Sequence, residues 1–151
     1  MNDGDGLEIA SLLNRYILGL DDEDVVLDEK WACGIFTRDA VVTFPVGESR
    51  GIEEIVQDHR RMLAAWERTQ HMHSPADVVV AGDSARLVAH VVATHVHRTG
   101  SPPHAPTADP PTFSAGTFVS AGVRRTADGW RFTSLGFRLR WTRGTPPHAR
   151  G

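Results

Sequence analysis

Residues 69–98 constrain the fold more than any other stretch of the chain. Two runs rich in β-branched side chains flank residues 81–84, and Gly82 within them is typical of a tight turn, so the stretch predicts a β-hairpin. Two His-x-His pairs lie at its ends: His71 with His73, and His95 with His97. Alternation along a strand puts both rings of a pair on one face, and the turn brings the pairs together. This patch is a metal site, an acid/base site or a consequence of a histidine-rich composition.

The length of 151 residues fits one domain whose core is large enough to fold alone. We therefore expect a single domain over residues 1–151, with a core at about 7–142 and disordered tails at 1–6 and 143–151. The single cysteine, Cys33, excludes an intramolecular disulfide and a cysteine-based metal cage.

Charge and hydropathy limit the partners and the location. The formal net charge of -3 gives no large basic surface, so nucleic acid is not an expected partner. No apolar run approaches the roughly 20 residues that span a bilayer, so no membrane partner is expected either. The acidic amino terminus lacks the basic and apolar regions of a signal peptide, which favours a cytoplasmic protein.

Apolar residues at three- and four-residue spacing predict three helices in the first half of the chain. The first has its apolar face on Ile9, Leu13, Tyr16 and Leu20. Asp5 and Glu8 have the spacing of a capping box at its start. The second is predicted from Leu27, Trp31 and Ile35 and ends near Phe36. A strand at residues 40–46 follows, and the third helix begins at Gly51 and carries His59, which we expect at its surface or boundary.

Two further strands are predicted at residues 113–125 and 130–142, joined by a turn. One face of the last strand carries Thr133, Leu135, Phe137, Leu139 and Trp141. If this face pointed outward it would be too apolar for the surface of a monomer, so a homodimer through the outer sheet face is expected. Residues 99–112 contain five prolines and must form a loop, because proline lacks the amide donor of a central strand.

Helices that precede a run of antiparallel strands are typical of the α+β class. We expect a curved, mostly antiparallel sheet that wraps around the three helices of the N-terminal half. Such a sheet leaves a cavity between itself and the helices, and the functional site is expected there.

Four segments resemble one family, and they stand in the order RYILGLDDED, IFTRDAVVTFPVGESRGIEEI, QHMHSPADVVVAGDSA and RRTADGWRFTSLGFRLRW. They are similar to the SnoaL-like branch of the nuclear transport factor 2-like superfamily, and the resemblance runs from about Leu7 to Trp141. That superfamily includes scytalone dehydratase, ketosteroid isomerase, polyketide cyclases and hexachlorocyclohexane dehydrochlorinase. The resemblance implies a cone-shaped barrel.

The resemblance also implies a catalytic pair. In the dehydratase-like members an aspartate just after the first helix orients a histidine that acts as general base, and the matching residues are Asp21 and His71. A second pocket histidine matches His95, with His97 as the neighbouring alternative. The chemistry agrees, since histidine titrates near neutral pH and an aspartate on its other ring nitrogen fixes the tautomer and stabilises the imidazolium.

Further residues are candidates for contact with a substrate, and each has a structural alternative. Tyr16 either donates a hydrogen bond to a substrate carbonyl or is a core aromatic residue. Arg138 either stabilises an anion in the cavity or faces solvent. The other candidates are His73, Trp31, Phe44 and Trp66. His97 is expected to be exposed.

We interpret the chain as a cofactor-independent acid/base enzyme, a dehydratase, cyclase or isomerase that acts on a small hydrophobic, polyketide-like secondary metabolite. This chemistry needs neither a cofactor nor a metal. Two alternatives stay open: a non-catalytic module of the same fold that binds a small ligand or dimerises, and a protein that holds a metal with histidines.

Overall fold

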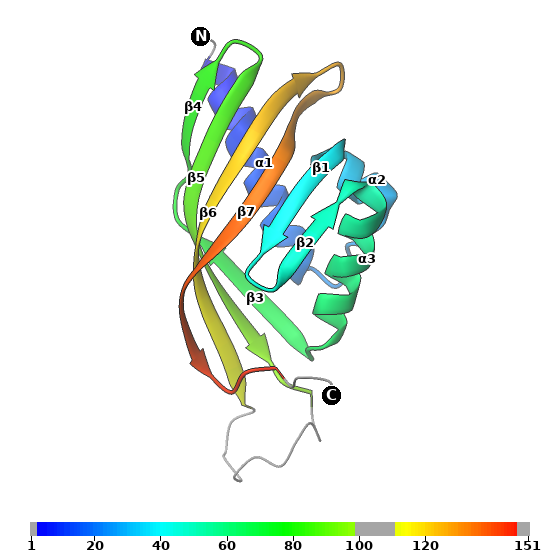
Figure 1. The fold of residues 1–151 in the computed structure, drawn as a ribbon, viewed down its shortest axis with the longest axis vertical. Helices are drawn as coiled ribbons and strands as arrows, with labels where there is room; N and C mark the ends of the chain where they lie inside the picture. Colours follow the sequence, from blue (N-terminus) through cyan, green and yellow to red (C-terminus); the bar gives the residue numbers. More distant parts are fainter. Residues whose placement is uncertain (1–2, 99–110, 148–151) are drawn as a thin grey trace.

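Three helices and seven strands make up residues 3–98 and 111–147, the part of the chain that the computed structural model describes (Figure 1). In chain order they are α1 (Asp3–Asp21), α2 (Glu29–Cys33), β1 (Phe36–Phe44), β2 (Gly47–Arg50), α3 (Gly51–Ala64), β3 (Arg68–His73), β4 (Asp77–Ala81), β5 (Ser84–Val96), β6 (Thr112–Thr126) and β7 (Gly129–Gly144). The α+β class and the helices in the N-terminal half are confirmed. Most of the proline-rich segment, residues 99–110, lies outside the described part. None of the described helices is long and apolar enough to cross a membrane.

All seven strands belong to one curved sheet that does not close. Its order is β2-β1-β7-β6-β5-β3, and β4 pairs with β5 as well, so β3 and β4 are two parts of one edge that is interrupted around Pro75. Every pairing is antiparallel except that of β1 with β7. Figure 1 shows α1 against one half of β5, β6 and β7, and α3 beside β1 and β2. The predicted hairpin is confirmed, with Gly82 at positive φ in its turn.

The second helix is shorter than predicted. Asp28 caps its start by accepting a hydrogen bond from the backbone of Trp31, and the helix ends at Cys33. The carbonyl of Ile35 already accepts the N–H of Phe132 from β7 at 2.8 Å, so pairing with the sheet replaces the helix there. β1 therefore starts at Phe36, and its hairpin partner β2 was not predicted.

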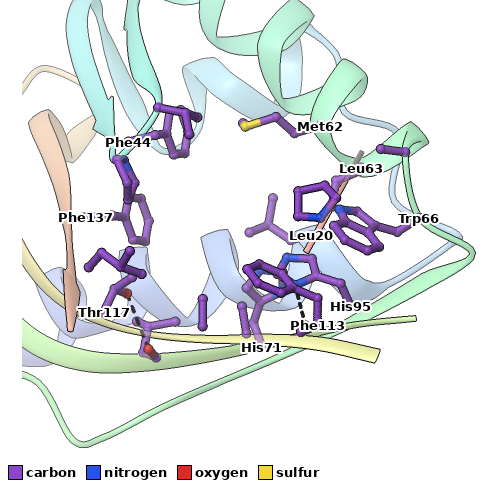
Figure 2. Close-up of a pocket in the computed structure, with 18 of the residues that line it drawn as sticks. Leu20, Phe44, Met62, Leu63, Trp66, His71, His95, Phe113, Thr117 and Phe137 are labelled. Atoms are coloured by element: carbon purple, nitrogen blue, oxygen red, sulfur yellow. Dashed lines mark hydrogen bonds between the residues drawn. The ribbon is translucent and has the colours of Figure 1, made fainter. Parts of the chain in front are cut away.

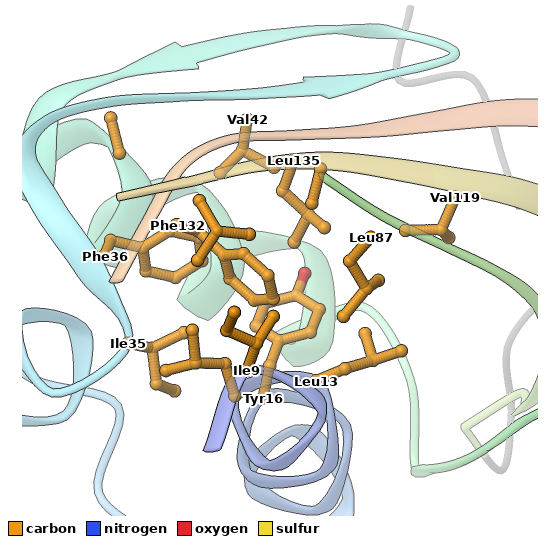
Figure 3. Packing of buried hydrophobic residues seen from close by; sticks show 14 of the residues in the cluster. Ile9, Leu13, Tyr16, Ile35, Phe36, Val42, Leu87, Val119, Phe132 and Leu135 are labelled. Atoms are coloured by element: carbon orange, nitrogen blue, oxygen red, sulfur yellow. The ribbon is translucent and has the colours of Figure 1, made fainter. Parts of the chain in front are cut away.

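The apolar face of α1 forms one side of the core. Ile9, Leu13 and Tyr16 are buried as predicted, and Figure 3 shows them pointing from the helix toward the aromatic rings of Phe36 and Phe132 under the sheet. Burial of side chains of this size stabilises the fold by roughly 1.5–3 kcal/mol each. This contact fixes α1 across the inner face of the sheet.

The predicted tail is wrong for residues 3–6, and the predicted capping box is wrong too, whereas residues 1–2 lie outside the described part. α1 begins at Asp3, and the carboxylate of Asp5 lies inside the fold, where it accepts hydrogen bonds from Arg125 at 2.9 Å and from the indole of Trp130 at 3.2 Å. Glu8 accepts the backbone N–H of Trp130 instead of capping the helix. The start of α1 is thus held by the β6–β7 hairpin, a long-range contact that spacing within the helix did not predict.

The predicted carboxyl-terminal tail is also ordered in part. The N–H of Thr145 donates to the carbonyl of Thr112 at 3.0 Å, and Thr145 in turn accepts a hydrogen bond from His97. Pro147 reaches the wall of the cavity described below. Residues 144–147 therefore belong to the folded domain, whereas residues 148–151 lie outside the described part.

β7 does not keep one face along its whole length. Gly116 of β6 pairs with Trp141, but the next residue of β6 pairs with Leu139. Arg140 is therefore an extra residue, and this β-bulge turns Trp141 onto the outer face, over Gly116. A second register shift displaces Thr133 in the same way. The predicted continuous apolar face is wrong at both of its ends.

The part of β7 that does keep its face points inward. Leu135 lies in the core, and Phe137 and Leu139 line the cavity, so the observation that motivated the homodimer no longer applies. The outer face offers a different apolar row, in which Met72, Val92, Gly116 and Trp141 lie on adjacent strands. Dimerisation through the outer face stays a prediction.

Replacing Val92 at the centre of this row by Lys tests that prediction. We expect the parent protein to sediment as a dimer at micromolar concentration and Val92→Lys as a monomer, because an unpaired charge in an apolar interface is costly. Leu18→Lys is the control, since Leu18 is exposed on α1, away from the outer sheet face, and it should remain dimeric. A monomeric parent protein would contradict the prediction.

Asp5→Asn tests the contact between α1 and the β6–β7 hairpin. The hydrogen bond from Arg125, followed by that from Trp130, lowers the pKa of Asp5 below its ordinary value of 3.8. Asp5 therefore stabilises the fold fully above about pH 4, and this stabilisation is lost as the pH falls through the lower folded pKa. In urea titrations, parent and Asp5→Asn should differ in free energy of unfolding at neutral pH and converge in strong acid.

The matched control for this experiment is Asp83→Asn. Asp83 also contacts Arg125, at 3.2 Å, but its side chain is exposed to solvent. Its loss should change the free energy of unfolding little at any pH. A difference between parent and Asp5→Asn that did not depend on pH would show that the carboxylate is not the stabilising group.

Candidate active site

A cavity of about 510 Å³ lies between the helices and the inner face of the sheet (Figure 2). Its lining is mostly apolar and aromatic, and its polar residues are three histidines, two threonines and a tyrosine. It includes Tyr16, Leu20, Phe44, His59, Met62, Leu63, Trp66, His71, Val91, His95, Phe113, Thr117, Phe137, Leu139 and Pro147. A cavity of this size and composition suits a small hydrophobic molecule.

Asp21 and His71 meet at one wall of this cavity. Asp21 is the last residue of α1, and His71 lies in β3. The Asp21 carboxylate accepts three hydrogen bonds from β3: from the Thr69 hydroxyl at 2.9 Å, from the backbone N–H of His71 at 2.6 Å and from Nδ1 of its ring at 2.7 Å. The predicted proximity of Asp21 and His71 is present in the structure.

The hydrogen bond to Asp21 fixes the tautomer of His71. A carboxylate only accepts, so Nδ1 of His71 carries the proton and Nε2 of the neutral ring keeps a lone pair. The side chain is 12% exposed, and the ring lines the cavity. This is the geometry of a general base whose imidazolium form a carboxylate stabilises.

His95 lies beside His71, with ring centroids 6.1 Å apart. Its position on β5 follows from the register, since Thr69 pairs with His95 and His71 with the neighbouring inward residue, Ala93. Nδ1 of His95 donates to the carbonyl of Phe113 at 2.9 Å, which leaves Nε2 as an acceptor. Burial lowers the pKa of His95, and this favours the neutral ring.

The other two histidines of the pairs do not join this patch. Nδ1 of His73 donates to the carbonyl of Ser74 at 2.7 Å, and the residue does not line the cavity. His97 was expected to be exposed but is buried. Its ring packs on Trp66, with ring centroids 4.7 Å apart, and its Nε2 donates to the carbonyl of Thr145 at 2.7 Å. The prediction that the four histidines of the two pairs meet in one patch is therefore wrong. Within residues 3–98 and 111–147, no three His, Cys, Asp or Glu side chains are grouped to hold a metal.

Tyr16 and His59 form a second polar pair in the lining. The Tyr16 hydroxyl lies 2.7 Å from Nε2 of His59, and Nδ1 of His59 lies 2.7 Å from the carbonyl of Ile55. Burial raises the pKa of Tyr16 and lowers that of His59 to about 4, so both are neutral at neutral pH. His59 was expected at the surface or boundary of α3 but is buried. The sequence did carry a signal for this: His59 follows Ile55 by four residues and precedes Met62 by three, which puts it on the apolar stripe of α3.

Two of the remaining candidates for substrate contact line the cavity. Phe44 stacks on Phe137, with ring centroids 5.6 Å apart and an angle of 5° between the planes. Trp66 packs against His95, with ring centroids 4.6 Å apart, and stacks on Phe113. Phe113 and Phe137 were not among the predicted site residues, and their inward position depends on the register of β6 and β7.

Trp31 and Arg138 lie outside the cavity, as His73 does, and this corrects their expected contact with a substrate. Trp31 packs in the core against Tyr16, with ring centroids 6.1 Å apart. Arg138 extends over the ring of Phe118 at 5.3 Å on the outer face of the sheet. An inward arginine is excluded there because Phe137 and Leu139, its neighbours on β7, occupy the inner face.

The fold and the cavity define a small α+β protein with a pocket of ligand size. The chain belongs to the SnoaL-like family, since the model of the SnoaL-like domain matches residues 4–136. No curated protein sequence matches the chain.

Solved structures show the same fold at low sequence identity. A nuclear transport factor 2-like superfamily protein from Salmonella enterica is 18% identical, with a TM-score of 0.73, and the match covers 98% of this chain and 94% of that one. The hexachlorocyclohexane dehydrochlorinase LinA-type3 from Novosphingobium barchaimii is 17% identical, with 95% and 94% covered and a TM-score of 0.75. A candidate scytalone dehydratase from Novosphingobium aromaticivorans is 18% identical, with 95% and 88% covered and a TM-score of 0.73. The nuclear transport factor 2-like fold is thus confirmed.

Buried His59 should make the fold less stable in acid. Its folded pKa of about 4 lies below the ordinary value of 6.5, so between these values the unfolded chain binds more protons than the folded one. Its effect on the free energy of unfolding changes by about 3 kcal/mol as the pH drops across this window. In urea titrations His59→Phe should lack this part of the pH dependence.

The control is His90→Gln, because His90 is exposed on the outer face of the sheet, beside Phe118 and outside the cavity. It should keep the pH dependence of the parent. If His59→Phe kept it too, His59 would have to take up a proton in the folded state.

Proposed function

We propose that this protein is a cofactor-independent acid/base enzyme, a dehydratase, cyclase or isomerase, acting on a small hydrophobic, polyketide-like substrate. One observation carries the proposal: the Nδ1–H of His71 donates to Asp21 at 2.7 Å at the wall of an apolar cavity. His71 is the general base, and Asp21 orients it. The relatives named for elimination reactions, a dehydrochlorinase and a candidate dehydratase, support a lyase of this kind.

The first step is removal of a proton from carbon next to a carbonyl. Nε2 of His71 takes the proton, the electron pair of the C–H bond moves into an enolate, and the imidazolium stays paired with Asp21. In a dehydration, the C–O bond at the next carbon then breaks, and the imidazolium returns its proton to the departing hydroxyl, which leaves as water. In an isomerisation or cyclisation the same proton returns to carbon or oxygen.

His95 takes part as a second acceptor. Its Nε2 is free, and its ring lies 6.1 Å from that of His71, so it can accept a hydrogen bond from a substrate hydroxyl and hold the leaving group beside the base. Burial lowers the pKa of His95 and so disfavours its charged form, which suits a ring that accepts a hydrogen bond without taking the proton from the substrate.

A flat, multi-ring substrate fits the aromatic walls. Phe44 with Phe137 and Trp66 with Phe113 form two stacked pairs on opposite sides of the cavity (Figure 2). Aromatic faces bind flat ligands with large contact area and little loss of side-chain freedom. The same walls suit a module that binds such a ligand without reaction, so turnover decides between the two.

3-Hydroxy-1-tetralone in deuterium oxide tests the base. We expect the parent protein to accelerate solvent deuterium incorporation at C2 and release of 1-naphthol, followed by NMR and absorbance. His71→Ala should lower both rates by on the order of 100-fold or more, and Asp21→Asn should lower them because the ring loses its orientation and its counter-charge.

His73→Ala is the matched control. It removes a histidine from the same strand that lies outside the cavity, and it should react as the parent does. Exchange at the parent rate in His71→Ala would end the proposed role of His71. Binding of the tetralone without any acceleration in the parent would favour the ligand-binding module.

A further inference from the structure

The Tyr16–His59 pair lies beside Phe44 and Phe137 in the wall of the cavity. The ring centroids of His59 and Phe44 are 5.4 Å apart, and those of Tyr16 and Phe137 are 6.2 Å apart. Figure 2 shows Phe44 and Phe137 on one side of the cavity and His71 with His95 on the other. The cavity thus has a polar pair beside Phe44 and Phe137 and two histidines on the other side, next to Trp66.

The direction of the hydrogen bonds in this pair follows from the carbonyl of Ile55. A carbonyl only accepts, so Nδ1 of His59 carries the proton, and Nε2 has only a lone pair. The Tyr16 hydroxyl must then donate its single proton to Nε2, at 2.7 Å. Its oxygen retains lone pairs and no proton for a ligand.

Such a phenol is an acceptor, not a donor. A hydroxyl that already donates a hydrogen bond is polarised and accepts a second one more strongly. A substrate carbonyl at this place would face the lone pairs of Tyr16, unless Tyr16 broke its bond to His59 and left the buried Nε2 unsatisfied. The expected hydrogen bond from Tyr16 to a carbonyl is therefore unfavourable.

We propose that the oxygen of Tyr16, held as an acceptor by the positioning residue His59, binds a hydroxyl of the substrate on the side of the cavity that Phe44 and Phe137 line. This inference rests on the proposed function for the place of the reacting carbon, and it adds to the substrate class: a flat, apolar molecule with a hydroxyl group remote from the acidic C–H. A ketone or ether oxygen at that remote position is selected against.

Binding of 2-naphthol and 2-methoxynaphthalene, measured by calorimetry, tests the inference without any turnover. The background is His71→Ala/His95→Ala, in which the other two imidazole acceptors of the cavity are absent. We expect 2-naphthol to bind about tenfold more tightly than its methyl ether, the size of one ordinary net hydrogen bond. Tyr16→Phe in this background should remove the preference.

His59→Phe gives the readout that a merely structural role would not. Without its acceptor, the Tyr16 proton becomes free to donate, so the preference should shift toward the ether. Thr117→Val is the control: it removes another hydroxyl of the lining whose oxygen retains lone pairs, and it should leave the preference unchanged if Tyr16 binds the naphthol hydroxyl.

The unaltered protein supplies a second measurement if the buried variants do not fold. In ¹⁵N NMR of labelled histidine, His59 should be protonated at Nδ1 alone at neutral pH, and its Nε2 signal should shift when 2-naphthol is added. A proton on Nε2 of His59, or equal affinity for the two naphthalenes in the double-alanine background, would overturn the inference. If His71→Ala reacted with the tetralone as fast as the parent does, the proposed reaction would be refuted. A retained preference for 2-naphthol would still support this binding site.

Discussion

The carboxylate of Asp21 joins the end of α1 to β3, and the position of His71, the proposed base, depends on this contact. Its two oxygens accept hydrogen bonds from Thr69 and from both the backbone and the ring of His71. One side chain therefore sets where the helix meets the sheet, which nitrogen of the imidazole carries the proton, and how the ring faces the cavity. A negative charge at the carboxyl end of a helix is unfavourable to the helix dipole, and three donors from another element offset that cost.

Some of the site could be predicted because its determinants are local in sequence. Asp21 continues the apolar face of a regular helix, and it alone of the four acidic residues at 21–24 turns inward, while the other three are exposed. Strand alternation and a tight turn at Gly82 then bring His95 near His71 without knowledge of any other strand. The resemblance to a family supplied which of these histidines to place beside the acid, and the contacts agree with it.

The rest depends on contacts between distant segments. Asp5 accepts hydrogen bonds from Arg125 and Trp130, which lie more than 100 residues away in the sequence, so no local pattern around Asp5 predicts these contacts. The bulge at Arg140 reverses the face of Trp141, and its position depends on the pairing of β6, not on the alternation within β7. His59 lies between charged residues in sequence, which indicated a surface position, although its helical phase indicated burial.

The cavity combines three imidazoles in the same protonation pattern, and this decides where a proton can go. In each ring Nδ1 donates to a fixed acceptor: Asp21 for His71, the carbonyl of Phe113 for His95 and the carbonyl of Ile55 for His59. All three Nε2 atoms are therefore hydrogen-bond acceptors. The groups that accept from Nδ1 differ, because those of His95 and His59 are neutral carbonyls. Of the three rings, His71 is the one with a carboxylate against its other nitrogen, whereas burial lowers the pKa of His59 and His95 and disfavours a proton on their Nε2 atoms. The histidines are thus alike in residue type and tautomer, and it is the partner of Nδ1 that distinguishes His71, the proposed base, from the other two.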